Sequence, residues 1–275
     1  MIATAGTSMS EILALEFMQN ALIGALLVSV ICGVIGSLIV INKMSFIVGG
    51  IAHGAYGGVG MAIYFGFSPL LGASVFSLLL ALIIAYITAR NNERFDAIIG
   101  AIWAFGMALG IIFADLAPGY KSDLMSFLFG SILAIDSATL NFTLICDAVF
   151  VLIIICFYRQ FLAISFDREF ATLRGVNTSV FYYVLVIMAS FAIVSAIQIV
   201  GLILVISLMT IPPFIAEKIS KNLGIMMISA VIISAIFCLS GLALSYFYNL
   251  TSGAAIILIA SVCFFATALI AKFHA

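Results

Sequence analysis

Long apolar runs separated by short polar interruptions follow one another along almost the whole chain. Each run has about twenty residues, enough for an α-helix to cross a hydrocarbon core of about 30 Å. None shows the strict alternation expected of a membrane β-strand. The pattern predicts an all-α polytopic membrane protein in which residues 1–275 form one transmembrane domain. We expect the crossings at residues 17–41, 48–66, 69–89, 97–115, 138–158, 179–197, 200–217, 224–247 and 252–271.

The apolar run from Val180 to Ala216 is too long for a single crossing. As one straight helix it would extend about 55 Å at 1.5 Å per residue. We therefore expect a break near Gln198 to Gly201. A tight re-entry at the break gives nine transmembrane helices, whereas a half-helix within the run gives eight.

Charged side chains are rare, and their distribution indicates an orientation. Hydrophobic residues make up 66% of the chain and charged residues 8%, against about 25% charged in soluble proteins. With nine crossings and an external N-terminus, every lysine and arginine except Lys121 lies on the cytoplasmic side, as the positive-inside rule favours. The C-terminus is then cytoplasmic. The net charge of −1 gives no reason to expect nucleic-acid binding.

A shorter apolar piece, Leu124 to Ile135, lies between the fourth and fifth predicted crossings. It is too short to span the membrane. We expect either a re-entrant or partial helix on the external side, facing protein or a water-filled cavity, or a helix lying on the membrane surface.

The second predicted crossing is rich in glycine and contains one histidine. Gly50, Gly54 and Gly58 recur every four residues, a spacing that lets a neighbouring helix backbone come close. His53 lies on another stripe of the same helix and is either a hydrogen-bonded structural residue or a ligand. Asp147, near the middle of the fifth crossing, is an intramembrane carboxylate and hence a candidate functional residue. A protonated or internally hydrogen-bonded acid is the alternative.

The longest polar interruption runs from Tyr158 to Ser179 and contains a short amphipathic pattern. Phe166, Phe170 and Leu173 recur at helical spacing. Asp167 is a good N-cap, and Gly175 is a good C-terminal stop. The other face carries Asp167, Arg168, Glu169 and Arg174. The pattern predicts a cytoplasmic helix whose apolar edge docks into another protein, or else a solvated connecting loop.

A pair of prolines, Pro212 and Pro213, lies in the seventh predicted crossing. Proline removes a backbone donor and clashes with the preceding turn, so the pair kinks or ends this helix. It marks either a hinge for a conformational change or the ordinary end of a helix.

Several stretches, taken in order, resemble the permease subunit of bacterial ABC importers for zinc, manganese or iron. The resemblance covers nearly the whole chain, although each stretch alone is only moderately specific. The stretches are MSFIVGGIAH from Met44, DAIIGAIWAFGMALGI from Asp96, FLFGSIL from Phe127, FDREFATLRGV from Phe166 and VGLILVISLMTIPPFIA from Val200.

The resemblance implies inward transport of Zn²⁺, Mn²⁺ or Fe²⁺ across the bacterial cytoplasmic (inner) membrane by alternating access. A second permease chain, most simply in a homodimer, would complete the translocation pathway, and membrane lipid would surround the two chains. An extracytoplasmic metal-binding protein would deliver the ion, and ABC ATPase subunits would drive transport. The sequence contains no G-x-x-x-x-G-K-[ST] motif, so hydrolysis must come from a separate chain. We expect no enzymatic activity and no permanently bound cofactor. The FDREFATLRGV stretch would be the coupling helix, within a coupling segment at about 159–178.

The sequence departs from the resembling family around the histidine. The family typically carries Asp four residues before it and Pro four residues after it, and these positions are Gly49 and Gly57 here. The resemblance implies that His53 is a metal ligand without its usual carboxylate partner, and Asp147 is the candidate replacement. The alternative is an ion-gradient-driven secondary transporter in which Asp147 and His53 form a proton relay. A requirement for ATP distinguishes the two.

Overall fold

The computed structural model describes residues 15–90, 95–117, 130, 132 and 135–273. Within these residues, nine helices are long and apolar enough to cross a membrane. They are α2 (Glu16–Ile41), α3 (Ser45–Phe65), α4 (Pro69–Arg90), α5 (Phe95–Leu116), α7 (Ser137–Cys156), α10 (Thr178–Val200), α11 (Leu202–Ile219), α12 (Leu223–Tyr248) and α13 (Ser252–Phe273). The predicted all-α fold is confirmed, and each predicted crossing agrees with a helix to within a few residues.

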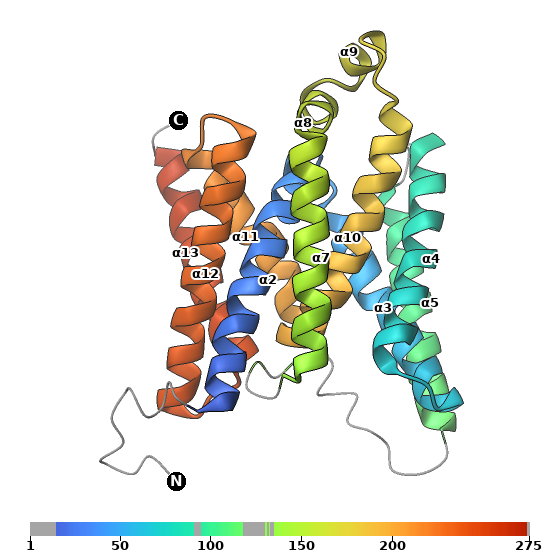
Figure 1. Ribbon diagram of the computed structural model, residues 1–275, viewed down its shortest axis with the longest axis vertical. Helices are drawn as coiled ribbons and strands as arrows, with labels where there is room; N and C mark the ends of the chain where they lie inside the picture. Colours follow the sequence, from blue (N-terminus) through green and yellow to red (C-terminus); the bar gives the residue numbers. More distant parts are fainter. Residues whose placement is uncertain (1–14, 91–94, 118–129, 131, 133–134, 274–275) are drawn as a thin grey trace.

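The long helices run side by side, with α2 in the middle of the bundle (Figure 1). This helix packs against α7, α10, α11 and α12. It is buried along most of its length because small residues, such as Ala21, Ala25 and Gly33, let neighbouring helices approach. At one edge of the bundle, α13 packs on α11 and α12, and at the other edge α3, α4 and α5 form a sub-bundle.

Helices α10 and α11 join the α3–α5 sub-bundle to the rest of the molecule, since α10 packs against α3, α4 and α2, and α11 packs against α3 and α2. The Thr88 and Tyr182 hydroxyl groups are 2.7 Å apart and hydrogen-bonded, which links α4 to α10. Both side chains are buried. The polar contact between the two parts of the bundle is therefore shielded from solvent, where a hydrogen bond is electrostatically stronger than in water.

The long apolar run breaks at Gly201, as predicted. Gly201 has φ +84° and ψ 162°, a region that is essentially restricted to glycine, so α10 ends and α11 starts in a new direction. Pro212 and Pro213 lie inside α11, which continues to Ile219, so the prolines do not end the helix.

The Met209 carbonyl is left without its usual intrahelical donor, because Pro213 has no N–H. A Cβ on Gly36 of α2 would lie 2.6 Å from this carbonyl oxygen and 2.9 Å from Cγ of Pro213. Glycine at position 36 thus lets α2 pack closely against the proline-containing part of α11. A hinge role for the prolines stays a prediction.

One end of the bundle carries the basic side chains that the structure describes, and Figure 1 shows two short helices, α8 (Tyr158–Phe166) and α9 (Arg168–Leu173), projecting there. Helix α13 ends at the same end of the bundle, and α2 starts at the opposite end. This arrangement fits the predicted positive-inside orientation, which stays a prediction. The apolar piece at 124–135 falls mostly outside the described residues. Its Gly130 has φ +64°, and a Cβ there would overlap backbone atoms of Val200 and Gly201.

Candidate functional site

His53 lies in the middle of α3 and faces α5. Its imidazole stacks on the indole of Trp103, with ring centroids 3.9 Å apart and an interplanar angle of 12°. The Nδ1 atom of His53 is buried and has no hydrogen-bond partner among the described residues. Trp103 donates its Nε1–H to Sδ of Met107, 3.2 Å away and one turn further along α5. The site therefore joins an imidazole, an indole and a thioether.

The space for the indole comes from the glycine one turn before the histidine. A Cβ on Gly49 would lie 3.2 Å from Cζ3 of Trp103. The position where the resembling family carries a carboxylate is thus occupied, in space, by an aromatic ring from another helix. On the other side of His53, a Cβ on Gly57 would lie 2.8 Å from Cε1 of Phe76. Both departures from the family pattern coincide with close packing of neighbouring helices.

The three glycines predicted to pack helices lie at contacts with α4 and α5. A Cβ on Gly58 would overlap the carbonyl oxygen of Gly72 in α4. A Cβ on Gly50 would overlap Cγ2 of Ile99, and one on Gly54 would overlap Cδ1 of Leu80. Close backbone approach of this kind favours van der Waals packing between membrane helices. It fixes the position of α3 and, with it, of His53.

Asp147 lies in a different helix interface from His53. It is 6% exposed on α7, and neither carboxyl oxygen has a hydrogen-bond partner among the described residues. Helix α7 packs against α2 and α10. One turn away, Ser195 donates to Thr143 over 3.2 Å. A pairing of Asp147 with His53 is therefore not formed in this structure.

A complete metal site is not assembled within the described part of the chain. It contains no group of three or more His, Cys, Asp or Glu side chains that could hold a metal ion. His53 and Asp147 each remain single candidate donors. An ion that passes here would need further oxygen, nitrogen or sulfur ligands from water, backbone or another chain.

The predicted coupling segment consists of two helices instead of one. Sequence analysis missed α8, although Phe161 and Ile164 pack into the core at helical spacing. The second helix, α9, has both predicted ends. Oδ1 of Asp167 accepts from the Phe170 N–H over 2.9 Å. Gly175 has φ +80°, with Gly175 N–H to Thr172 O and Val176 N–H to Ala171 O bonds, both 3.0 Å, which together make a Schellman cap.

The apolar edge of the coupling segment is exposed. Phe166 is 71% exposed, Phe170 51% and Leu173 87%. The Arg174 guanidinium lies 5.1 Å from the centroid of the Phe170 ring. On the inner face Ala171 is fully buried, and the Arg168 guanidinium lies 4.8 Å from the centre of the Tyr182 ring of α10. Glu169 is exposed in the first turn. The helix is thus fixed to the bundle on one side and presents apolar side chains on the other.

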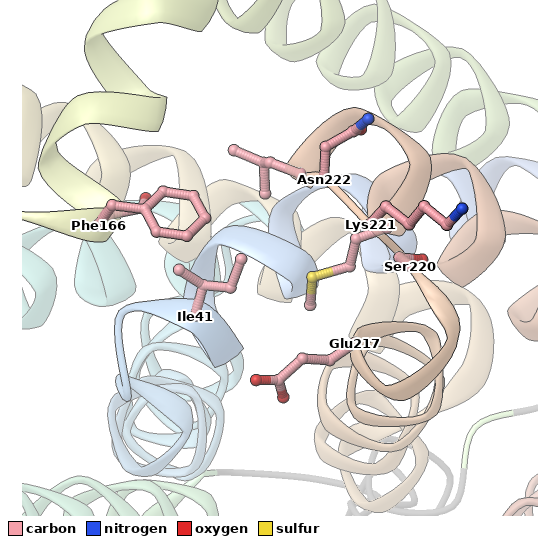
Figure 2. Close-up of a pocket in the computed structure, with 9 residues that line it drawn as sticks. Ile41, Phe166, Glu217, Ser220, Lys221 and Asn222 are labelled. Carbon is pink, nitrogen blue, oxygen red and sulfur yellow. The ribbon is translucent and has the colours of Figure 1, made fainter.

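A pocket of about 360 Å³ lies beside the coupling segment. Figure 2 shows Phe166 of α8 on one side of it and the turn between α11 and α12 on the other. Glu217 and Lys221 give the wall both an acidic and a basic side chain. Sequence analysis missed this pocket because its wall comes from four separate helices. The lining residues are Ile41, Ser165, Phe166, Glu217, Ser220, Lys221, Asn222, Leu223 and Met226.

Comparison with known proteins gives consistent similarities over most of the chain. Residues 14–271 match the sequence model of the ABC 3 transport family. An uncharacterized membrane protein of Synechocystis is 47% identical over 94% of this chain and 92% of its own length. The manganese transport system membrane protein MntC of Listeria monocytogenes is 34% identical over 91% of this chain and 89% of its own length. The solved structure of PsaBC from Streptococcus pneumoniae in complex with Fab superposes with a TM-score of 0.84 at 31% identity, covering 94% of this chain and 93% of that chain.

Proposed function

We propose, since the chain belongs to the ABC 3 transport family, that it is the membrane permease subunit of an ATP-driven importer for a divalent transition metal. The chain is a multi-pass membrane protein and a transport subunit, and in this family the ATPase is a separate chain. Mn²⁺ and Zn²⁺ are the preferred cargo, and Fe²⁺ is third. The relatives named for manganese transport support Mn²⁺. A lone imidazole without a neighbouring carboxylate suits Zn²⁺ better.

The exposed apolar edge of the coupling segment is the observation that carries the proposal. An aqueous surface that exposes Phe166, Phe170 and Leu173 together needs a partner to cover it. Fully burying one such side chain contributes roughly 1.5–3 kcal/mol. The caps at Asp167 and Gly175 fix the shape of this edge before docking, which lowers the entropy cost of binding. The partner we propose is the ATPase subunit.

The remaining parts of the assembly follow from the same proposal. The basic end of the bundle, with α8 and α9, faces the cytoplasm and the ATPase. The opposite end faces an extracytoplasmic metal-binding protein. Two copies of the chain enclose the pathway. His53 binds the ion transiently while the pathway opens in turn to the two sides of the membrane. Asp147 is the second candidate ligand, and it reaches His53 only if the helices that separate them move.

Uptake into vesicles tests the coupling role. The permease, the ATPase and the binding protein are reconstituted, and ATP-dependent uptake of Mn²⁺ and Zn²⁺ is measured. We expect Leu173→Glu to abolish uptake, because a charged side chain replaces an apolar contact in the docked interface. The matched control is Ser179→Glu, an exposed position in the first turn of α10, where a negative charge is tolerated.

Two outcomes contradict the proposal. Uptake near the wild-type level in Leu173→Glu would remove the coupling role of α9. Wild-type uptake that needs a proton gradient but no ATP would instead support the secondary transporter with Asp147 and His53 as a proton relay.

A further inference from the structure

Trp103 is the only tryptophan in the chain, and its indole is held by several contacts from α3 and α5. Its face stacks on His53, and its Cζ3 edge lies over Gly49. Its N–H donates to Met107. Phe46 lies against it with ring centroids 6.5 Å apart and tilted by 50°. The indole therefore has little freedom to rotate, and the imidazole stacked on it shares that restriction.

A metal-binding histidine normally gives its second ring N–H to an acceptor, which fixes the ring and its tautomer. His53 lacks this support, because its buried Nδ1 has no partner among the described residues. The residue is partly exposed, so its accessible surface belongs to atoms other than Nδ1. The orientation of the imidazole is then set by stacking on Trp103 instead of by a hydrogen bond.

We propose, on the basis of the importer function above, that Trp103 is a positioning residue for His53. The indole holds the imidazole flat against α5, so that Nε2 is the nitrogen available to a passing cation. When Nε2 binds an ion, the proton sits on Nδ1, where the structure offers no acceptor. Loss of such an acceptor typically weakens metal binding 10- to 100-fold. The stack thus gives an oriented ligand that binds weakly and releases its ion.

Fluorescence tests the contact directly, because Trp103 is the only tryptophan and excitation at the red edge of the indole band, where tyrosine does not absorb, selects its emission. Paramagnetic Mn²⁺ quenches an indole at close range. We expect saturable quenching by Mn²⁺, competed by Zn²⁺ and absent in His53→Gln. Mg²⁺ is the control, since it prefers oxygen ligands and keeps its waters. Equal quenching in His53→Gln, or no saturable quenching in the wild type, would overturn the proposal.

Transport kinetics separate positioning from simple stability. We expect Trp103→Ala to raise KM for the metal about tenfold and to leave kcat near the wild-type value. Trp103→Phe keeps a stacking ring and should restore KM. The matched control is Phe113→Ala, which removes an aromatic contact with Tyr64 and Phe65 in the same α3–α5 interface, about 15 Å further along α5.

The outcomes distinguish this inference from the importer function. If Trp103→Ala keeps the wild-type KM, or if Phe113→Ala raises KM equally, Trp103 does not position His53. If the wild-type complex shows no ATP-dependent uptake, the importer function fails, and the fluorescence titration still decides whether an ion at His53 reaches Trp103.

Discussion

Replacing Gly175 by alanine isolates the contribution of the α9 cap to docking. Gly175 has φ +80°, and no described atom lies within 4 Å of a Cβ built there, other than those of its immediate neighbours. The substitution therefore meets no steric obstacle, and its whole cost is the left-handed backbone, about 1–2 kcal/mol for a residue with a Cβ. A helix of six residues has little stability of its own to offset this cost.

The strained cap should shift the local equilibrium of α9 away from its docked shape. A cost of 1–2 kcal/mol corresponds to a factor of about 5–30. We therefore expect Gly175→Ala to weaken binding of the permease to its ATPase about 5- to 30-fold. Binding is measured by titrating labelled ATPase onto the permease in nanodiscs. At saturating ATPase the stimulated hydrolysis rate should return to the wild-type value, because the docked complex itself is unchanged.

Three variants serve as controls for this experiment. Gly66→Ala introduces the same strain, at φ +74° and with open space around the Cβ, but at the C-cap of α3. Gly100→Ala meets open space at an ordinary helical φ and should be neutral or stabilising by up to about 1 kcal/mol. Gly175→Asn should lose less than alanine, since asparagine tolerates the left-handed region. Wild-type affinity in Gly175→Ala, or an equal loss in Gly66→Ala, would refute the reasoning.

Further predictions concern the membrane helices. Gly58→Ala should destabilise the folded protein by about 1–3 kcal/mol through overpacking, because its Cβ overlaps the Gly72 carbonyl oxygen. The thermal midpoint in detergent should therefore fall; an unchanged midpoint would mean that α3 and α4 separate at little cost. Asp147→Asn should raise the thermal midpoint and lower metal uptake, since an unpartnered buried carboxyl costs stability and marks function; wild-type uptake would remove Asp147 from the pathway. Gly49→Asp alone should disturb folding, because its side chain meets the Trp103 ring. The double variant Gly49→Asp with Trp103→Ala should fold and favour Mn²⁺ over Zn²⁺ in competitive uptake, because a carboxylate is a harder ligand than an imidazole. An unchanged metal preference would exclude position 49 from selectivity.

Features with a local signal were predictable from the sequence. Each crossing carries its own apolar run, and Gly201 marks the break because few other residues adopt its backbone conformation. The ends of α9 were also predictable, because the caps at Asp167 and Gly175 are made by hydrogen bonds within one helical turn of each residue. The prolines of α11 gave a weaker signal, because packing against Gly36 stabilises a helix that continues past them.

Features that depend on which helices pair were beyond the sequence. Membrane helices are apolar on all sides, so hydrophobic periodicity does not show which face is buried. The stack of Trp103 on His53 depends on how α5 is aligned along α3. That alignment is fixed by contacts such as Gly60 against the Gly110 backbone, between residues fifty positions apart in the sequence. The separation of Asp147 from His53 has the same origin, since α7 packs on α2 while α3 packs on α5.

The glycine contacts of α3 also oppose sliding of this helix along α4 and α5. Where Gly58 meets the Gly72 backbone, a shift along the helix axis would bring larger side chains against a carbonyl group. We therefore expect helices α3, α4 and α5 to move as one unit, which contacts the rest of the bundle through α10 and α11. Tyr182 of α10 is hydrogen-bonded to Thr88 of α4, and the Arg168 guanidinium of α9 lies over its ring. One path of direct contacts therefore leads from the coupling segment through Tyr182 to the group of helices that carries His53.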